Sequence, residues 1–191
     1  MIEKHRIHNR QSIRIQGFDY ASPGSYFVTI VSHHRLNIFG EVLHGEVKLS
    51  PVGKVVERKW QEIPSHFKNI SLDVFVIMPN HIHGILNINE RSDEEAHFRS
   101  FTIDDVAVLN DPGFPKGPKP QSLGAIIGLF KSAVTKKIHE LCLLENEKVW
   151  QRNYYEHIIR DDEDLNQIID YIETNPDNWE ADTEYNPEIC I

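Results

Sequence analysis

Runs of β-branched and aromatic residues predict the strands of this chain. Gly24 to Ser32, "GSYFVTIVS", follows a Pro-Gly turn signal and predicts the first strand. Residues 72–78 and 81–87 predict two more, and Pro79-Asn80 joins them so tightly that they must be antiparallel neighbours. Other extended segments are expected as a β-hairpin, with arms around residues 36–43 and 46–49, and as a short strand within "VWQRNYYEHIIR".

Three segments instead place apolar residues at the 3.6-residue spacing of a helix. The first begins at Ser50, a residue type that caps helix N-termini, and Pro64 is expected to stop it. The second is "SLGAIIGLFKSAVTKKIHEL", which Ser122 opens and which carries one apolar stripe. The third is "DEDLNQIIDYIETNP", which Pro176 ends near Asn175.

These elements follow one another as strand, helix, strand, strand, helix, strand and a final helix. The order predicts an α+β fold, a ferredoxin-like sandwich with an antiparallel sheet, helices on one face and a further C-terminal helix. The length of 191 residues suits a single domain, residues 1–191. Its accessory parts are expected to be a basic N-terminal arm (1–20), an exposed charged and Pro/Gly-rich insertion (89–120) and an acidic tail (180–191).

Composition narrows the cellular setting. No apolar run approaches the ~18 residues of a membrane span, and the polar start "MIEKHRIHNRQ" is unlike a secretory signal. A cytoplasmic protein without membrane contact is therefore expected. The two cysteines, Cys142 and Cys190, lie in no metal-type spacing, which predicts neither a disulfide framework nor a zinc site.

The charge of the chain is uneven along its length. A net charge of −9 argues by itself against a nucleic-acid partner. However, residues 161–191 hold eleven acidic residues and no Lys or Arg, so residues 1–160 carry about +2. We hypothesise that this tail, or the acidic stretch Asp93 to Glu95, occupies a nucleic-acid groove in place of phosphate. Deleting the residues after Trp179 is then expected to tighten DNA binding.

His81 and His83 are the first candidates for chemistry. They lie two apart on the strand predicted for residues 81–87, so both side chains project from one face while Ile82 points to the other. Two neighbouring imidazoles can bind one divalent cation and, without a third His or a Cys, leave coordination positions open for a substrate. The residues alone are a weak signal for a metal, and they favour two strand histidines that simply face solvent.

The last predicted helix offers a nucleophile. Tyr171 and Asn175 are one turn apart on the same face, at the border of the apolar stripe. A tyrosine hydroxyl placed there can attack a metal-polarised phosphodiester, and the Asn175 carbonyl oxygen can complete the metal site. The alternative is that Tyr171 only packs its ring and that Asn175 terminates the helix before Pro176.

Three motifs together resemble a known family. "MPNHIHG" resembles the His-hydrophobic-His motif of single-tyrosine HUH transposases. "VWQRNYYEHIIRDDEDLNQIIDYIETNPDNW" resembles the C-terminal signature of their REP-associated branch, the tyrosine transposases linked to repeated extragenic palindromes. The opening "RQSIRIQGFDYASPGSYFVTIVSHHRLNIFGEV" is similar to the N-terminal region of that branch, so the resemblance runs from about Arg10 to Trp179.

The resemblance implies a role for each candidate residue. His81 and His83 match the metal-binding pair of the family. Tyr171 matches the nucleophile, and Asn175 matches the polar residue that serves as third ligand. The implied cofactor is Mg²⁺ or Mn²⁺, and the implied fold is the same ferredoxin-like sandwich.

The resemblance also implies a reaction and a partner. Family members cleave and rejoin single-stranded DNA near hairpins, through a 5′-phosphotyrosine that leaves a free 3′-hydroxyl. The expected partner is therefore single-stranded or hairpin DNA with REP-like palindromes. Family members act as monomers or as dimers, so a monomer or a homodimer is expected here.

Other residues compete for roles or extend the site. Tyr155 and Tyr154 are alternative nucleophiles, and they point to opposite faces if their segment is a strand. Contacts with DNA are expected from arginines of the N-terminal arm and from polar residues in the second half of the chain, namely Arg6, Arg10, Arg14, Lys131, Gln151 and Arg152.

The favoured interpretation is an active tyrosine transposase. A rival is a non-catalytic palindrome or hairpin DNA-binding protein on the same fold, which predicts hairpin binding without a metal requirement and without a covalent adduct. A third interpretation is a metal-dependent phosphoesterase that uses water as nucleophile. It predicts DNA cleavage that survives the substitution Tyr171→Phe.

Overall fold

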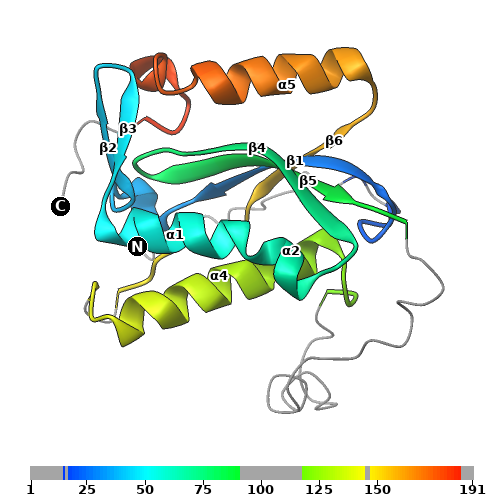
Figure 1. Ribbon diagram of the computed structural model, residues 1–191, viewed down its shortest axis with the longest axis horizontal. Helices are drawn as coiled ribbons and strands as arrows, with labels where there is room; N and C mark the ends of the chain where they lie inside the picture. The colour runs from blue at the N-terminus through cyan, green and yellow to red at the C-terminus, as the bar shows by residue number, and fades with distance from the viewer. Residues whose placement is uncertain (1–14, 16, 91–117, 145–146, 186–191) are drawn as a thin grey trace, which may run out of the picture.

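An antiparallel sheet forms the middle of the protein (Figure 1). A computed structural model describes residues 15, 17–90, 118–144 and 147–185. The sheet order is β4-β5-β1-β6, and every neighbouring pair is antiparallel. Its strands are β1 (Gly24–Val31), β4 (Ile70–Ile77), β5 (His81–Ile88) and β6 (Tyr155–Ile159).

Helices cover the two faces of this sheet unequally (Figure 1). α1 (Pro51–Gln61) and α4 (Leu123–Glu140) lie side by side on one face, whereas α5 (Asp162–Thr174) lies on the other. Together with the strand order, this arrangement is that of a ferredoxin-like sandwich with an added C-terminal helix. The predicted fold is therefore confirmed.

The first helix starts as its sequence predicts but ends differently. The Ser50 hydroxyl accepts a hydrogen bond from the Gly53 backbone N–H at 3.0 Å, which satisfies one of the free donors at the helix start. The prediction that Pro64 stops this helix is wrong, because α1 already ends at Gln61. Pro64 lies instead in a second short helix, α2 (Ile63–His66), within the first turn, where a missing N–H breaks no helical bond.

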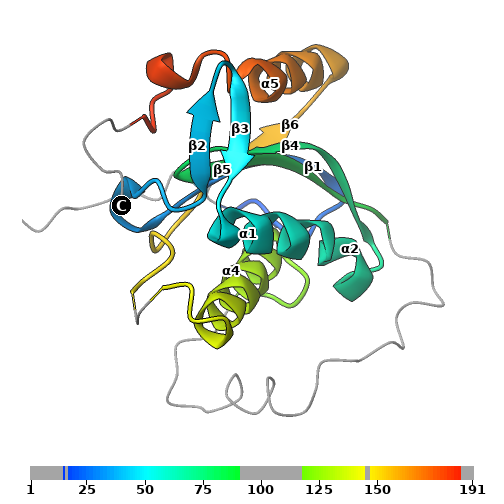
Figure 2. The same cartoon turned by 60° about the vertical axis from the view of Figure 1, so that its left-hand side comes forward.

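The predicted β-hairpin is present beside the main sheet. Its strands are β2 (Gly40–Leu43) and β3 (Glu46–Leu49), so the first arm is shorter than the predicted residues 36–43. Figure 2 shows this hairpin rising beside the end of α5. At its tip, Gly45 has a φ of +79° and lies against the Asp177 side chain, a conformation and a close approach that both suit glycine.

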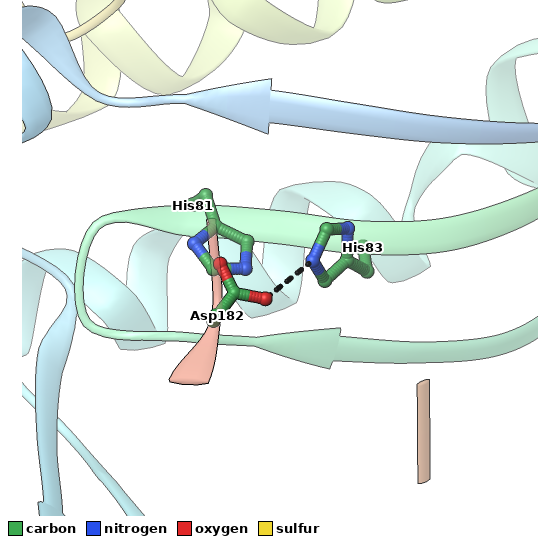
Figure 3. A group of neighbouring side chains, drawn as sticks. All are labelled: His81, His83 and Asp182. Carbon is green, nitrogen blue, oxygen red and sulfur yellow. Dashed lines mark ion pairs between the residues drawn. The ribbon is translucent and has the colours of Figure 1, made fainter. Parts of the chain in front are cut away.

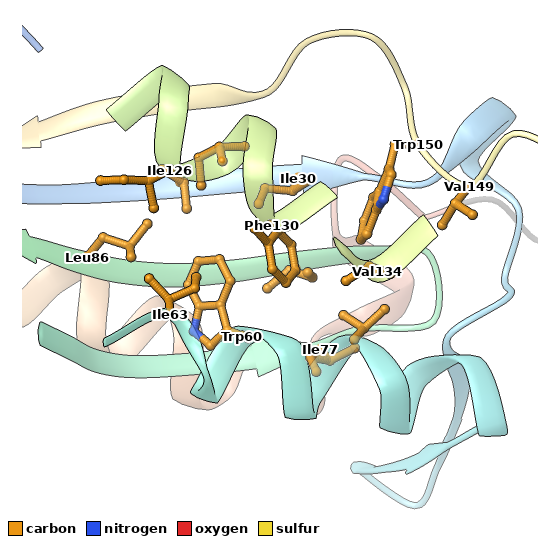
Figure 4. Close-up of a cluster of buried hydrophobic side chains, with 14 of the residues drawn as sticks. Ile30, Trp60, Ile63, Ile77, Leu86, Ile126, Phe130, Val134, Val149 and Trp150 are labelled. Atoms are coloured by element: carbon orange, nitrogen blue, oxygen red, sulfur yellow. The ribbon is translucent and has the colours of Figure 1, made fainter. Parts of the chain in front are cut away.

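Apolar side chains fill both sides of the sheet. The larger cluster lies between the sheet and the pair α1 and α4, where Trp60 meets Phe130 edge-on at 5.3 Å (Figure 4). A smaller cluster of Phe27, Ile85 and Ile172 lies under α5. Because strand side chains alternate between the faces, β5 contributes to both clusters.

The accessory parts stay predictions. The arm (1–20), the insertion (89–120) and the tail (180–191) fall largely outside the described residues, and so do Arg6, Arg10 and Arg14. Within the part of the chain that the structure describes, no helix has both the length and the apolar character needed to cross a membrane.

Candidate metal and nucleophile site

β5 places His81 and His83 side by side on the face that α5 covers. Both are buried, with 0% and 3% of their surface exposed, and their ring centroids are 4.3 Å apart. Ile82, between them, packs into the large cluster on the other face. The two histidines therefore do not face solvent, and their burial in a polar pair requires partners.

Asn80 is the partner of His81. Its amide Nδ2 donates to the backbone carbonyls of Arg35, at 3.2 Å, and Glu184, at 2.8 Å. The amide oxygen must therefore face His81, where it accepts from Nδ1–H at 2.9 Å. Nε2 of His81 then carries a lone pair, and it is buried without a hydrogen-bond partner among the described residues.

His83 belongs to a chain of hydrogen bonds that ends at a carboxylate. Its Nδ1 lies 2.9 Å from the Thr29 hydroxyl, and its Nε2 lies 3.1 Å from the Tyr171 hydroxyl. Tyr171 donates its one proton to Oδ2 of Asp182 at 3.0 Å, so Nε2–H of His83 donates to Tyr171 and the Thr29 hydroxyl donates to Nδ1. A hydroxyl can also accept, so Thr29 equally supports the other tautomer, in which Nε2 of His83 is a free lone pair.

Asp182 brings a carboxylate into the site from the segment after α5 (Figure 3). Its side chain is fully buried, and its Oδ2 lies 3.7 Å from Nε2 of His83 and 2.8 Å from Nδ2 of Asn175. The segment is held by further contacts, because Trp179 packs against the His81 ring at 5.9 Å and Arg35 pairs with Glu184 at 2.6 Å.

Burial and charge set the protonation of these groups. Burial and then the Asp182 carboxylate raise the pKa of the Tyr171 phenol well above its usual value of 10.0. Burial also acts to raise the pKa of Asp182. The polar contacts of this carboxylate, of which the contact with His83 is the largest, outweigh burial and lower the pKa below its usual value. Burial lowers the pKa of His81. At neutral pH the site therefore holds a neutral tyrosine, an ionised carboxylate and a neutral imidazole.

These residues fit a divalent cation. One ligand atom each from His81, His83 and Asp182 lies within 4.8 Å of the others. The buried, unpartnered lone pair of His81 is the atom type that a metal would satisfy. Two imidazoles and one carboxylate leave coordination positions open, which is a catalytic rather than a structural pattern.

Asn175 reaches this cluster, but its carbonyl oxygen does not face it. The amide Nδ2 points at Asp182, while Oδ1 is buried with no hydrogen-bond partner among the described residues. Asn175 can become the predicted third ligand only if its amide turns over, whereas the Asp182 carboxylate already offers an oxygen within 4.8 Å of the two imidazole nitrogens. Sequence reasoning missed Asp182 as a candidate ligand. The only sequence signal was the acidity of the tail, which suggested an anion in the DNA groove.

The two alternative nucleophiles lie on opposite faces, as the strand pattern predicts. Tyr154 packs against the large cluster, away from the histidines. Tyr155 is 44% exposed on the α5 face, where its ring meets that of Phe27 at 6.4 Å. Tyr171, which is 41% exposed, contacts His83 directly, so the geometry favours Tyr171 over Tyr155 as nucleophile.

The predicted DNA contacts are only partly free. Lys131 donates to the backbone carbonyls of Gln151, at 2.5 Å, and Asn153, at 3.3 Å. Its ammonium also lies 5.9 Å from the centre of the Trp150 ring. Lys131 therefore ties α4 to the segment before β6, whereas the Arg152 side chain is exposed.

Comparisons with known proteins find relatives of this chain. No family model matches the chain. The chain is 38% identical to an uncharacterized protein of Haemophilus influenzae over 179 residues, and this aligned region covers 94% of each protein. The chain belongs to the same family as that protein. It is also 24% identical over 166 residues to a Haemophilus influenzae protein named as a REP-associated tyrosine transposase, covering 83% of this chain and 73% of the other.

A solved structure of a REP-associated tyrosine transposase bound to a REP hairpin has the same fold. It superposes with a TM-score of 0.51 at 17% identity and covers 88% of this chain and 74% of its own. The chain is thus similar in sequence to one REP-associated tyrosine transposase and shares the fold of another. The resemblance that the motifs predict is confirmed.

Proposed function

We propose that this relative of the REP-associated tyrosine transposases is a metal-dependent endonuclease and strand transferase for single-stranded DNA. The observation that carries the proposal is the position of the Tyr171 hydroxyl, 3.1 Å from Nε2 of His83 and beside a second buried imidazole. The solved relative binds a REP hairpin, which supports hairpin DNA as the partner. The protein would act in the cytoplasm, as a monomer or a homodimer.

In the proposed reaction, Oη of Tyr171 attacks the phosphorus of a phosphodiester next to a hairpin. The bond between phosphorus and the 3′ oxygen breaks, the 5′ phosphate stays on the tyrosine, and the 3′ end leaves as a hydroxyl. The phosphotyrosine keeps the energy of the broken bond, so rejoining needs no nucleotide cofactor. His81 and His83 would hold Mg²⁺ or Mn²⁺, and this cation would stabilise the charge on the phosphoryl oxygens.

The proton of Tyr171 already has an acceptor, but a poor one. Its hydroxyl donates to Oδ2 of Asp182 at 3.0 Å. The lowered pKa of Asp182 and the raised pKa of Tyr171 make full transfer of this proton unfavourable. The arrangement therefore suits a resting site, in which the Asp182 carboxylate stands where a phosphate oxygen of DNA would stand. Replacement of Asp182 by DNA would remove the negative charge that keeps Tyr171 protonated.

The same contact supports a second candidate, a non-catalytic hairpin-binding protein. If Asp182 never leaves Tyr171, the phenol stays protonated and no adduct forms. This protein would bind hairpin DNA without forming a covalent bond to it, and without a metal requirement.

A denaturing-gel assay separates these functions. Purified protein is incubated with single-stranded DNA that carries a hairpin, in Mn²⁺, Mg²⁺ or EDTA, and cleavage and protein–DNA adduct are scored. The proposal predicts a metal-dependent adduct that disappears in Tyr171→Phe and survives in Tyr155→Phe. Tyr155→Phe is a matched control because the two tyrosines are similarly exposed, at 44% and 41%, on the same face.

Three results would contradict the proposal. Hairpin binding without any adduct or cleavage supports the binding protein. Cleavage that survives Tyr171→Phe without an adduct supports a water nucleophile. An adduct that survives Tyr171→Phe and disappears in Tyr155→Phe moves the nucleophile to Tyr155.

A further inference from the structure

A groove runs between α1 and α4, on the face of the sheet opposite to the histidines. Both views show these two helices side by side, with the sheet between them and α5 (Figures 1 and 2). The groove has a volume of about 550 Å³, and its lining includes three apolar residues, Val55, Ala133 and Leu141. It is therefore a separate surface from the candidate metal site.

Cations line both walls of this groove. α1 contributes Lys54, Arg58 and Lys59, and α4 contributes Lys136 and Lys137. The basic residues of each wall share one side of their helix because of their spacing in the sequence. Lys54 and Arg58, for example, are four residues apart, which is about one helical turn. Glu140 is the single acidic residue among the lining residues that the structure describes.

Internal ion pairs neutralise only part of this charge. Glu62 pairs with Arg58 at 2.9 Å and with Lys59 at 2.5 Å, and Glu140 pairs with Lys137 at 3.3 Å. Lys54 and Lys136, one on each wall, are exposed and make no ion pair with other described residues. The groove therefore carries an excess of positive charge, although the chain as a whole has a net charge of −9. A local excess of this kind favours an anionic partner.

We propose that this groove binds the phosphate backbone of a DNA hairpin stem, an inference that rests on the proposed function. Lysines on two walls suit a polymer with regularly spaced phosphates, and such contacts position DNA without reading its sequence. The apolar residues of the lining suit the sugar edges between the phosphates. The stem is held on the α1 and α4 face, and the single-stranded segment beside it passes the sheet edge to reach Tyr171.

Charge reversal on both walls tests this proposal. The variant Lys54→Glu with Lys136→Glu is compared with Lys48→Glu with Lys119→Glu, which makes the same charge change at two lysines that are each 72% exposed and do not line the groove. Binding of a fluorescent hairpin is followed by anisotropy over a series of salt concentrations. The groove variant is expected to bind on the order of tenfold more weakly, with a salt slope shallower by about 2. The control is expected to change affinity far less.

The proposal would be overturned if hairpin binding weakened equally in both double variants, or if it weakened in neither. In the second case, an acidic protein becomes the alternative partner of the groove. A urea unfolding curve shows whether each variant is folded. The control variant loses the exposed ion pairs of Lys48 with Glu41 and of Lys119 with Asp19, so a small shift of its curve to lower urea concentration is expected. The tyrosine adduct on the hairpin DNA itself, at saturating protein, separates the two levels of inference. If the groove proposal alone is wrong, wild type still forms this adduct, whereas if the proposed function is wrong no protein forms it.

Discussion

Asn80 fixes the protonation of His81 through a 2.9 Å hydrogen bond between its Oδ1 and Nδ1 of the ring. The amide cannot turn over without losing the bonds from Nδ2 to two backbone carbonyls. His81 is therefore already set to offer Nε2 to a cation, whereas Nε2 of His83 is engaged by Tyr171. A residue that orients a ligand in this way usually changes metal affinity when it is removed.

We expect Asn80→Ala to weaken Mn²⁺ binding about 10- to 100-fold, because the imidazole loses the acceptor that selects its tautomer. Isothermal titration calorimetry measures this affinity, and a urea unfolding curve checks that the variant is folded. Asn89→Ala, at an exposed asparagine that follows β5, is the matched control and is expected to bind Mn²⁺ like wild type. Equal affinity in the two variants would show that Asn80 does not orient a ligand.

Local sequence rules were enough to predict the pieces of this site. Strand alternation placed His81 and His83 on one face, and helical spacing placed Tyr171 and Asn175 on one face of their helix, because each depends only on the geometry of a single element. That the helix lies against the histidines was implied only by the family resemblance.

Long-range contacts account for what was missed. Asp182 reaches the site through the turn after α5, where no apolar periodicity sets the path of the chain. The orientation of the Asn80 amide depends on carbonyls of Arg35 and Glu184, which are 45 and 104 residues away in sequence. The wrong stop at Pro64 has a different cause, since a proline in the first turn of a helix is as acceptable as one just after its end.

Gly84 gives a test of how tightly β5 is packed behind the histidines. A Cβ at this position would lie 2.6 Å from Cζ2 of Trp60 and 3.0 Å from Cβ of Phe75. Trp60 is fully buried and cannot move away freely, so we expect Gly84→Ala to lower the free energy of unfolding by about 1–3 kcal/mol. Urea denaturation measures this change.

The matched control is Gly128→Ala, in the middle of α4. A Cβ there would meet no described heavy atom within 4 Å, so the substitution is expected to stabilise the helix by about 0.5–1 kcal/mol. A neutral or stabilising Gly84→Ala would mean that the sheet and α1 are packed less closely than described.

Lys131 predicts a pH dependence of stability. Burial lowers the pKa of its ammonium from 10.5 to about 8. Between these two pH values the unfolded chain binds more protons at this residue than the folded chain does, so this contribution to stability rises as pH increases through about 8. The effect is lost in Lys131→Met. We expect wild type to gain about 1 kcal/mol relative to Lys131→Met between pH 7 and pH 9.5, a value reduced for partial exposure of the group.

Urea denaturation at the two pH values measures this difference. Lys136→Met is the control, because Lys136 is exposed on the same helix. The wild-type and Lys136→Met proteins are expected to show the same change with pH. Parallel behaviour of Lys131→Met and Lys136→Met would show that Lys131 titrates as an ordinary surface lysine.

Asp182 is either an occupant of the DNA site or a metal ligand, and one substitution separates the two. As an occupant, its carboxylate repels the incoming phosphate and keeps Tyr171 protonated, so Asp182→Asn is expected to tighten hairpin DNA binding about tenfold and to raise adduct yield. Deleting the residues after Trp179 should act in the same direction. The control is Glu180→Gln, which removes one negative charge, as Asp182→Asn does, but from an exposed side chain in the same segment. It should have little effect in the anisotropy and gel assays. If Asp182→Asn instead weakens Mn²⁺ binding and lowers adduct yield, the carboxylate serves the metal rather than blocking the DNA.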